Sequence, residues 1–399
     1  MPRAVWLLSP VLALALLPSN LVATALPLLR TEWGASATAL GWTFSAYQLG
    51  YVVGVLGLLP LTDRVALPRV IGSSAALSTL AFLLFPVLAR DVASASLLRL
   101  LAGVGLAGVY LPGVRVVAAQ ADAHRRGLAV GMYVSAFYLG SALSLAVAGA
   151  LLPAVGWRGA AWVLGAAQLL GLPLAVLGTR EAPGPQGRSA RLALGVLRQR
   201  PVRGFILAYT GHCWELYTSR GWLAAFLASV LAAAGRGPVE AAAEAGWWAG
   251  IIGALGIAGV WLGGALSDRL GRAPTALAIA LASGALSLAY GWLAAGGWTL
   301  SVTLGCLYGL LVAADSAVYS TAITEVAPPG QVGSAQAVQA AIGFLAAALA
   351  PVAGGLALDA GGGYGSVFAL AGGIGLVLAL PLLPLARAVP RASATAPGP

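Results

Sequence analysis

The sequence predicts an all-α integral membrane protein of twelve transmembrane helices, arranged as two pseudo-symmetric six-helix bundles. Three observations predict this fold class. The 399-residue chain is 60% hydrophobic and only 9% charged, with a mean hydropathy of +0.91, whereas about 25% of the residues in a soluble globular domain are charged. Apolar stretches of about 20 residues, long enough to cross a bilayer, recur along the whole chain. A pattern in the first half also returns in the second half at a nearly constant offset.

The helices are delimited by clusters of charged residues, glycine and proline, which interrupt the apolar stretches. The expected spans are residues 5–28, 38–60, 69–89, 94–119, 127–152, 158–179, 202–232, 243–266, 274–295, 299–325, 332–357 and 364–386. The longest polar break separates six spans from six. We therefore expect an N-terminal bundle over residues 1–179, a cytoplasmic linker over 180–201, a C-terminal bundle over 202–386 and a cytoplasmic tail over 387–399.

An even number of spans places both termini on one side of the membrane. The loops on that side carry most of the arginines, whereas the opposite side has only Arg30, Arg90, Arg158 and Arg236. Because positively charged loops stay in the cytoplasm, we expect cytoplasmic termini in a multi-pass protein of the cell's inner or plasma membrane. Topology also accounts for the net charge of +10, so no nucleic-acid partner is expected.

Several classes of function are disfavoured by residues that the chain lacks. It contains no lysine, which a Walker A phosphate-binding loop and a retinal Schiff base both require. Its two cysteines, Cys213 and Cys306, lie in separate apolar spans, and its two histidines, His124 and His212, are too few for a metal site. No nucleophile motif with a histidine partner is present. We therefore expect neither an enzyme nor a cofactor or metal.

The two halves of the sequence repeat. The tetrapeptide LTDR at residues 61–64 corresponds to LSDR at residues 266–269. Glycines repeat at the same offset of 205 to 206 residues, which pairs Gly103 with Gly309 and Gly149 with Gly355. An offset this constant indicates duplicated six-helix halves in the same orientation.

These tetrapeptides belong to longer motifs that carry a family resemblance. The stretch GALSDRLGR, residues 264–272, resembles the G-x-L-a-D-R-x-G-R signature of the major facilitator superfamily of secondary transporters, and LPLTDRVALPR, residues 59–69, is a degraded first copy. The family's helix-4 motif, R-x-x-x-G-x-G, appears at Arg99. The resemblance covers nearly the whole chain. Two further stretches, YLPGVRVV and HRRGLAVG, are similar to the family's permeases for cyanate, nitrate and other small anions.

The resemblance implies a transporter that functions as a monomer by alternating access, in which helices 1, 4, 7 and 10 line a central cavity. It also implies that charged residues of the motifs act in gating and conformational change. These residues are Asp63, Arg64, Arg99, Asp268, Arg269 and Arg272.

Ionisable residues lie deep within the predicted spans, although each costs about 2.5 to 3.5 kcal/mol at a helix centre. They are Arg99 and Arg115 in the fourth span, His212, Glu215 and Arg220 in the seventh, and Asp315 in the tenth. All three spans belong to the set that lines the cavity in the family. We therefore expect these groups to converge on a shared hydrated chamber between the two halves.

The polar residues of these spans form a candidate site. We expect Arg115, Arg220, Asn20 and Tyr319 to bind solute, and Glu215, Asp315 and His212 to couple transport to protons. At 100° per residue, Glu215 and Arg220 are about 140° apart on a straight helix. Arg220 is therefore expected to meet a carboxylate on another helix, with Asp315 the candidate. Otherwise the helix breaks between the two residues, near Ser219 and Gly221. A fixed ion pair is the alternative role for Arg220 and Asp315.

Three buried arginines against two buried carboxylates favour an anionic solute. The sequence therefore predicts a symporter that moves a small carboxylate or inorganic anion across the lipid bilayer, with protons as the coupling ion. The alternative is a drug/proton antiporter of the same fold. It is less favoured because helix 5 of such antiporters carries G-x-x-x-G-P-x-x-G-G, whereas YLGSALSLAVAG here contains no proline.

Overall fold

The computed structural model describes the chain except for residues 63, 123–124, 185–193, 329–330 and 388–399, and leaves the side chains of residues 59, 60, 127, 294 and 295 undescribed. All regular secondary structure in the described residues is helical. The N-terminal half contains α1 (Arg3–Leu16), α2 (Leu21–Trp33), α3 (Ala37–Leu61), α4 (Leu67–Leu88), α5 (Val92–Gln120), α6 (Arg126–Ala167), η2 (Gln168–Leu170) and α7 (Gly171–Gly178).

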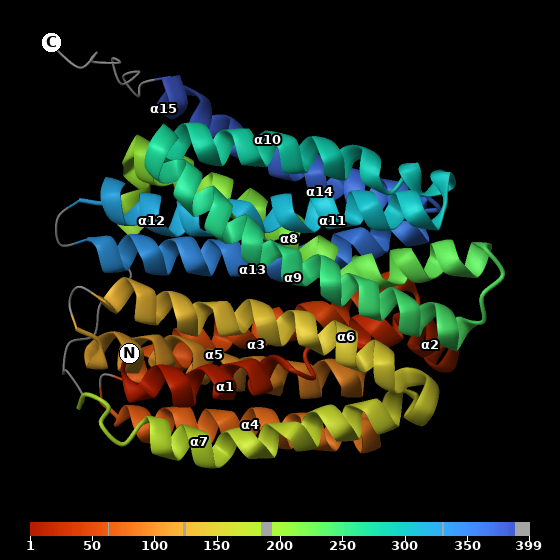
Figure 1. Ribbon diagram of the computed structural model, residues 1–399, viewed down its shortest axis with the longest axis horizontal. Helices are drawn as coiled ribbons and strands as arrows, with labels where there is room; N and C mark the ends of the chain where they lie inside the picture. The colour runs from red at the N-terminus through yellow and green to blue at the C-terminus, as the bar shows by residue number, and fades with distance from the viewer. Residues whose placement is uncertain (63, 123–124, 185–193, 329–330, 388–399) are drawn as a thin grey trace, which may run out of the picture.

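The C-terminal half contains η3 (Leu194–Arg198), α8 (Arg200–Ala233), α9 (Pro238–Leu270), α10 (Arg272–Tyr290), η4 (Leu293–Gly296), α11 (Trp298–Ala314), α12 (Ser316–Val326), α13 (Val332–Asp359), α14 (Gly363–Ala379), η5 (Leu380–Leu382) and α15 (Leu383–Arg387). The helices of the two halves form two layers that run along the long axis of the molecule, with the start of α1 and the last described helix, α15, at the same end (Figure 1). An even number of spans predicts that the first and last spans have their outer ends on the same side of the membrane. The domain boundaries near residues 179 and 202, and the cytoplasmic location of the termini, stay predictions.

The described helices account for twelve membrane crossings. Ten are long and apolar enough to span a membrane. One of these ten, Leu128–Gly178, has 51 residues, which as a straight helix would measure about 76 Å, more than twice the hydrocarbon thickness of about 30 Å. The chain reverses within it at Gly156, where φ is +63° and ψ is 178°, so it crosses twice. The 25-residue α3 supplies the remaining crossing. The predicted all-α fold of twelve spans is confirmed.

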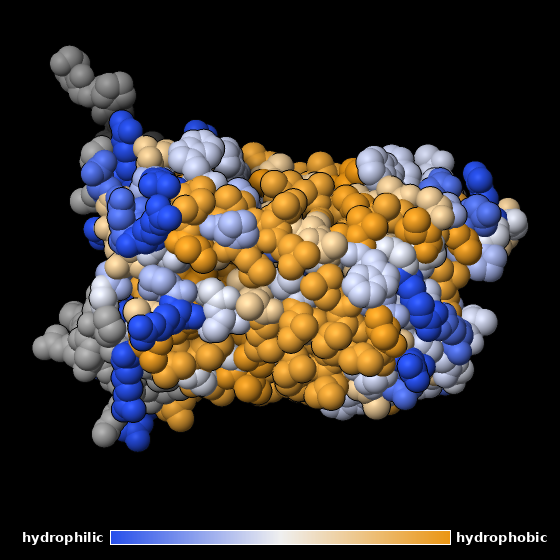
Figure 2. Space-filling view, turned by 90° about the horizontal axis from the view of Figure 1, so that it is seen from below, coloured by the Kyte–Doolittle hydropathy of each residue, from blue (hydrophilic) through white to orange (hydrophobic). Residues whose placement is uncertain are grey.

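A broad apolar band lies between the two charged ends of the molecule (Figure 2). Large apolar side chains are exposed on the surface of the molecule, among them Trp261 at 70% and Leu170 at 66%. Such exposure in a soluble monomer would produce an aggregating patch. In a bilayer, the same band contacts lipid.

The sequence repeat corresponds to a repeated packing contact. A Cβ atom added to Gly103 of α5 would lie 2.0 Å from the Tyr47 carbonyl oxygen of α3, and one added to Gly309 of α11 would lie 2.3 Å from the Ile252 carbonyl oxygen of α9. Tyr47 and Ile252 are separated by the same 205 residues as the LTDR and LSDR tetrapeptides. Glycine is required at both positions because the backbones of the paired helices approach so closely.

The two halves contact each other through a second repeated pair. A Cβ on Gly149 of α6 would lie 2.5 Å from the Ala243 carbonyl oxygen of α9, and one on Gly355 of α13 would lie 2.6 Å from the Ala37 carbonyl oxygen of α3. Both contacts join one half to the other. Ala37 begins α3 and Ala243 lies near the start of α9, and both helices start at the end of the molecule opposite the start of α1 (Figure 1). The halves therefore pack backbone against backbone at that end.

The contact between α3 and α13 carries an additional polar link. Asp359, the last residue of α13, accepts hydrogen bonds from the backbone N–H groups of Ala37 and Thr38, at 2.9 and 2.8 Å, and from the Thr38 hydroxyl at 2.6 Å. A carboxylate at a helix N-terminus satisfies otherwise unpaired N–H groups. Here the capping carboxylate comes from the opposite half, so opening this end of the molecule breaks the cap.

We predict that Asp359→Ala increases about fivefold the fraction of molecules in which the halves are separated at the α3–α13 contact. An N-cap is worth about 1 kcal/mol, and 1.4 kcal/mol is a factor of ten in an equilibrium constant. The matched control is Asp91→Ala. Asp91 caps α5 by accepting from the Ser94 N–H at 2.8 Å, within one half. Its loss should lower stability without changing the separation of the halves.

The measurement is a distance distribution between spin labels on Arg30→Cys and Arg236→Cys, in a background in which Cys213 and Cys306 are serine. Arg30 and Arg236 are exposed at this end of different halves. An unchanged distribution in Asp359→Ala would show that the cap does not hold the halves together.

Candidate functional site

Two small spaces lie between the halves at the centre of the molecule. The first has a volume of about 30 Å³ and the second about 40 Å³, and Ser141 and Arg220 line both. One water needs roughly 10–15 Å³. Together the two spaces, called the central cavity below, have room for a few waters in this conformation. A solute can enter only if the halves separate.

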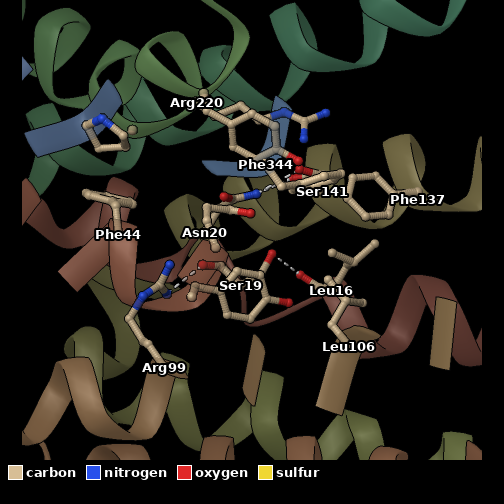
Figure 3. A pocket seen from close by; sticks show the side chains of 15 residues that line it. Leu16, Ser19, Asn20, Phe44, Arg99, Leu106, Phe137, Ser141, Arg220 and Phe344 are labelled. Carbon is tan, nitrogen blue, oxygen red and sulfur yellow. Dashed lines mark hydrogen bonds between the residues drawn. The ribbon is translucent and has the colours of Figure 1, made fainter. Parts of the chain in front are cut away.

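The lining of the first space is aromatic and basic (Figure 3). The aromatic side chains are Phe44, Tyr47, Phe137, Tyr217 and Phe344, and the polar ones are Ser19, Asn20, Gln48, Arg99, Ser141 and Arg220. No aspartate or glutamate is among the described residues that line either space. The described lining of the cavity therefore has two arginines and no compensating carboxylate.

Arg220 is held by aromatic rings. Its guanidinium carbon lies 5.6 Å from the centre of the Phe137 ring, 5.5 Å from that of Tyr138 and 5.2 Å from that of Tyr217. Attraction between a cation and a ring face is worth about 0.5–2 kcal/mol. Arg220 makes no hydrogen bond or ion pair with a described residue. Its donors are therefore available to an anion.

Both sequence-based expectations for the partner of Arg220 are wrong. The helix does not break near Ser219 and Gly221, because α8 is continuous from Arg200 to Ala233. Asp315 does not meet Arg220 either, since its carboxylate pairs with His212. On the unbroken helix, Arg220 points toward the N-terminal half while Glu215 points into the C-terminal half.

His212 and Asp315 form a buried pair. The distance from His212 Nδ1 to Asp315 Oδ1 is 2.7 Å, and the two side chains are 3% and 5% exposed. The other ring nitrogen, Nε2, lies 2.8 Å from the Ser316 hydroxyl, which lies 3.0 Å from the Tyr138 hydroxyl of α6. Asp315 is placed here because the tenth span is interrupted at this residue, between α11 and α12.

Glu215 lies inside the C-terminal half rather than on the cavity. Its carboxylate accepts a hydrogen bond from the Ser283 hydroxyl of α10 at 2.7 Å. It also lies against α14, where a Cβ on Gly375 would be 3.2 Å from Oε2. The expected chamber shared by all the buried charges is therefore divided. Arg99 and Arg220 line the cavity, whereas Glu215, His212 and Asp315 lie behind its wall.

Arg99 stabilises an interruption in the first span. The chain leaves helical geometry between α1 and α2, at a Pro18-Ser19-Asn20 sequence. Arg99 donates to the Ser19 carbonyl at 2.7 Å and to the Thr43 carbonyl of α3 at 2.7 Å. A carbonyl freed by a helix break in the membrane needs a protein donor. Arg99, which is 2% exposed, supplies that donor.

Asn20 and Tyr319 take different positions. Asn20 lines the cavity, and its side-chain amide donates to the Ser141 hydroxyl at 2.9 Å and to the Ser141 carbonyl at 3.0 Å. Tyr319 is fully buried in the C-terminal half, with its ring 5.8 Å from that of His212. Arg115 donates to the Thr62 hydroxyl near the end of α3 and lines none of the described spaces. Of the four expected solute contacts, the structure therefore brings Arg220 and Asn20 to the cavity.

The residues expected to act in gating are separated. Asp63 lies outside the described residues, and Arg64 and Arg269 are exposed. Arg272 pairs with Asp268 and donates to the Ser267 hydroxyl at 2.7 Å. Its guanidinium also pairs with Glu325 of α12 at 2.9 Å, so this cluster ties three helices of one half together.

Sequence analysis missed Tyr138, Glu325 and the aromatic side chains around Arg220. Glu325 could have been found as an acidic residue at the end of the tenth span, on the side of the LSDR motif. Tyr138 could not, because nothing in a single sequence distinguishes it from other tyrosines of the spans.

Comparison with known proteins gives matches along the whole chain. A family model described as Major Facilitator Superfamily matches residues 8–238 and 216–399. The Streptomyces coelicolor protein named as probable transporter SCO4007 is 30% identical over 378 residues, which cover 88% of this chain and 80% of that protein. Other curated relatives match in part. The chain spans 41% of the length of the uncharacterized transporter YgaY of Escherichia coli O157:H7, at 30% identity.

Several partial matches bear names that describe a solute, and two of them represent different classes of compound. The 3-(3-hydroxy-phenyl)propionate transporter of Escherichia coli is 38% identical over 138 residues, 34% of this chain and 33% of that protein. The multidrug efflux pump LfrA of Mycolicibacterium smegmatis is 33% identical over 191 residues, 46% of this chain and 36% of the pump. The expected likeness to cyanate and nitrate permeases is not confirmed by these matches.

Solved structures share the fold. The nucleoside transporter NupG superposes with a TM-score of 0.76 at 14% identity, over 96% of this chain and 100% of that one. The inward-open xylose transporter XylE of Escherichia coli gives a TM-score of 0.75 at 16% identity, over 94% of each chain.

We predict that Arg99→Gln lowers the free energy of unfolding by about 1–3 kcal/mol, because the Ser19 and Thr43 carbonyls lose their charged donor inside the membrane. The measurement is the thermal unfolding midpoint of the purified protein. Arg158→Gln is the matched control. Arg158 also stacks on an aromatic ring, that of Trp157 at 4.2 Å, but its side chain is 47% exposed, so its loss should cost less than about 1 kcal/mol. Equal midpoints for the two variants would contradict the proposed bracing role of Arg99.

Proposed function

This chain belongs to the major facilitator superfamily, and we propose that it transports a small organic anion, an aromatic carboxylate, together with a proton. In this proposal the chain functions as a monomer, and its halves rock about the central cavity so that the site opens to each side in turn. The anion binds at Arg220, and the proton binds at the His212–Asp315 pair.

The proposal rests on the positive charge of the cavity, which no carboxylate of the described lining residues compensates. Arg99 is satisfied by carbonyl groups, but Arg220 has no hydrogen-bonding partner among the described residues. A buried charge without a partner is expensive, and an anion offsets that cost. Carboxylates also match the guanidinium, since both can form two parallel hydrogen bonds. The solute carboxylate is therefore placed against Arg220.

The walls of the cavity favour an aromatic solute. Phe137 and Tyr217 flank Arg220, and Phe344 packs between the halves with its ring 4.4 Å from that of Tyr51 and 5.8 Å from that of Tyr217. Offset and edge-to-face ring pairs are worth about 0.5–1.5 kcal/mol beyond area burial. A relative named for a phenylpropionate supports the same class of solute.

The alternative function is drug efflux, which the relative LfrA favours. An arginine-lined cavity without a carboxylate repels cations, so it disfavours a cationic drug. Transport assays with both classes of compound therefore separate the two functions.

We predict that the wild-type protein in proteoliposomes transports benzoate, 4-hydroxybenzoate or 3-(3-hydroxyphenyl)propionate. Arg220→Gln should reduce this transport at least tenfold, because a charge-assisted hydrogen bond is worth about 1.5–3 kcal/mol. The exposed Arg30→Gln is the control and should transport as the wild type does. Transport of cationic dyes with no transport of the three carboxylates would instead support drug efflux. Undiminished carboxylate transport by Arg220→Gln would remove this residue from the site.

We also predict that transport responds to the pH gradient but not to voltage. One proton carried with a monovalent anion moves no net charge, so the membrane potential contributes nothing. A gradient of one pH unit is worth 1.36 kcal/mol and should support up to about tenfold accumulation. Valinomycin-imposed potentials provide the comparison. Accumulation that follows the potential and ignores the pH gradient would contradict coupling to a single proton.

A further inference from the structure

A row of four polar side chains connects the proton site to the cavity. Tyr138 O–H lies 3.0 Å from Ser316 Oγ, Ser316 Oγ lies 2.8 Å from His212 Nε2, and His212 Nδ1 lies 2.7 Å from Asp315 Oδ1. Tyr138 belongs to α6 of the N-terminal half and the other three to the C-terminal half. The row therefore crosses between the halves, and any motion that separates them here breaks its first bond.

Tyr138 contacts both the row of hydrogen-bonded side chains and Arg220. Its hydroxyl ends the row of hydrogen bonds, and its ring lies under the Arg220 guanidinium, 5.5 Å from ring centre to carbon. Tyr138 and Arg220 also line the same space between the halves. A carboxylate bound to Arg220 in this space would therefore lie beside the Tyr138 side chain.

The protonation state of His212 determines the direction of the two hydrogen bonds that join its Nε2 to Ser316 and Ser316 to Tyr138. When His212 is neutral with its proton on Nδ1, Nε2 accepts from Ser316, and Ser316 accepts from Tyr138. When His212 is protonated, Nε2–H donates to Ser316, and the Ser316 hydroxyl donates to the Tyr138 oxygen. In the first state the Tyr138 proton is engaged by Ser316. In the second state it is free to donate elsewhere.

We propose that Tyr138 couples anion binding to proton binding, an inference that rests on the proposed function. A proton from water binds His212, the hydrogen bonds of Ser316 and Tyr138 reverse, and the Tyr138 hydroxyl becomes a donor to the solute carboxylate on Arg220. No covalent bond other than the N–H bond of His212 is formed. Proton binding therefore strengthens anion binding, and by linkage the anion strengthens proton binding equally.

Other ionisable groups surround the His212–Asp315 pair, but they do not replace the route through Ser316 and Tyr138. They are Tyr209, Cys213, Glu215 and Arg220 of α8, Tyr308 of α11 and Tyr319 of α12. Glu215 is engaged by Ser283 on the far side of α8 from the cavity. Unlike these groups, Tyr138 belongs to the N-terminal half.

The test is the dissociation constant of benzoate, measured by calorimetry on the full-length protein between pH 5 and pH 9. For the wild type, affinity should fall at least tenfold as pH rises, because the anion loses a hydrogen bond from Tyr138. Ser316→Ala disconnects Tyr138 and leaves its hydroxyl free, so binding should stay tight at every pH. Tyr138→Phe removes the donor, so binding should stay weak at every pH.

Ser320→Ala is the matched control, since Ser320 lies one turn further along α12 and its hydroxyl bonds only to the Ser316 carbonyl of its own helix. It should keep the wild-type pH dependence. If Ser316→Ala and Tyr138→Phe also keep that dependence while Arg220→Gln loses binding, the coupling route is overturned and the proposed function stands. If the wild type does not bind benzoate, or Arg220→Gln binds it equally well, the proposed function fails and the coupling route fails with it.

Discussion

The cost of burying charge within a membrane organises the interior of this protein. Each ionisable group in the spans must find a partner, because hydrocarbon offers none. Arg99 donates to two carbonyls, Asp315 pairs with His212, and Glu215 is engaged by a serine. Arg220 differs, because its guanidinium packs against aromatic rings and makes no hydrogen bond or ion pair with a described residue. In the proposed function, the solute anion provides the missing partner.

The same constraint explains why two spans are interrupted where they are. An interrupted helix exposes backbone groups that would be costly in lipid, so both interruptions lie in the protein interior. At the first, Arg99 donates to the Ser19 carbonyl and the Ser144 hydroxyl accepts from the Asn20 backbone N–H. The second places Asp315 beside His212. Helix interruptions thus supply both a wall of the cavity and one member of the buried acid–base pair.

The halves meet in two chemically different ways, which suits a structure that must open. At the end opposite the termini, glycines bring backbones together at Gly149 and Gly355, and Asp359 caps a helix of the other half. Between the two spaces, the contacts across the halves include the hydrogen bond from Tyr138 to Ser316, the Tyr51–Phe344 ring pair and the stacking of Arg220 on Phe137 and Tyr138. These contacts are made by side chains rather than by closely packed backbones. In the proposed function, they are the ones that respond to solute and proton.

The sequence by itself determined the fold class, the twelve spans, the repeat and the identity of most buried ionisable residues. Composition and hydropathy suffice for these, because a bilayer permits few structures, and charges in apolar stretches stand out. The partners of those charges were decided only by the tertiary structure. A straight helix predicted that Glu215 and Arg220 diverge, but the direction each faces depends on how α8 rotates against its neighbours. That rotation is set by contacts between segments distant in sequence, such as Glu215 with Ser283 and Trp222 with the Pro351 carbonyl.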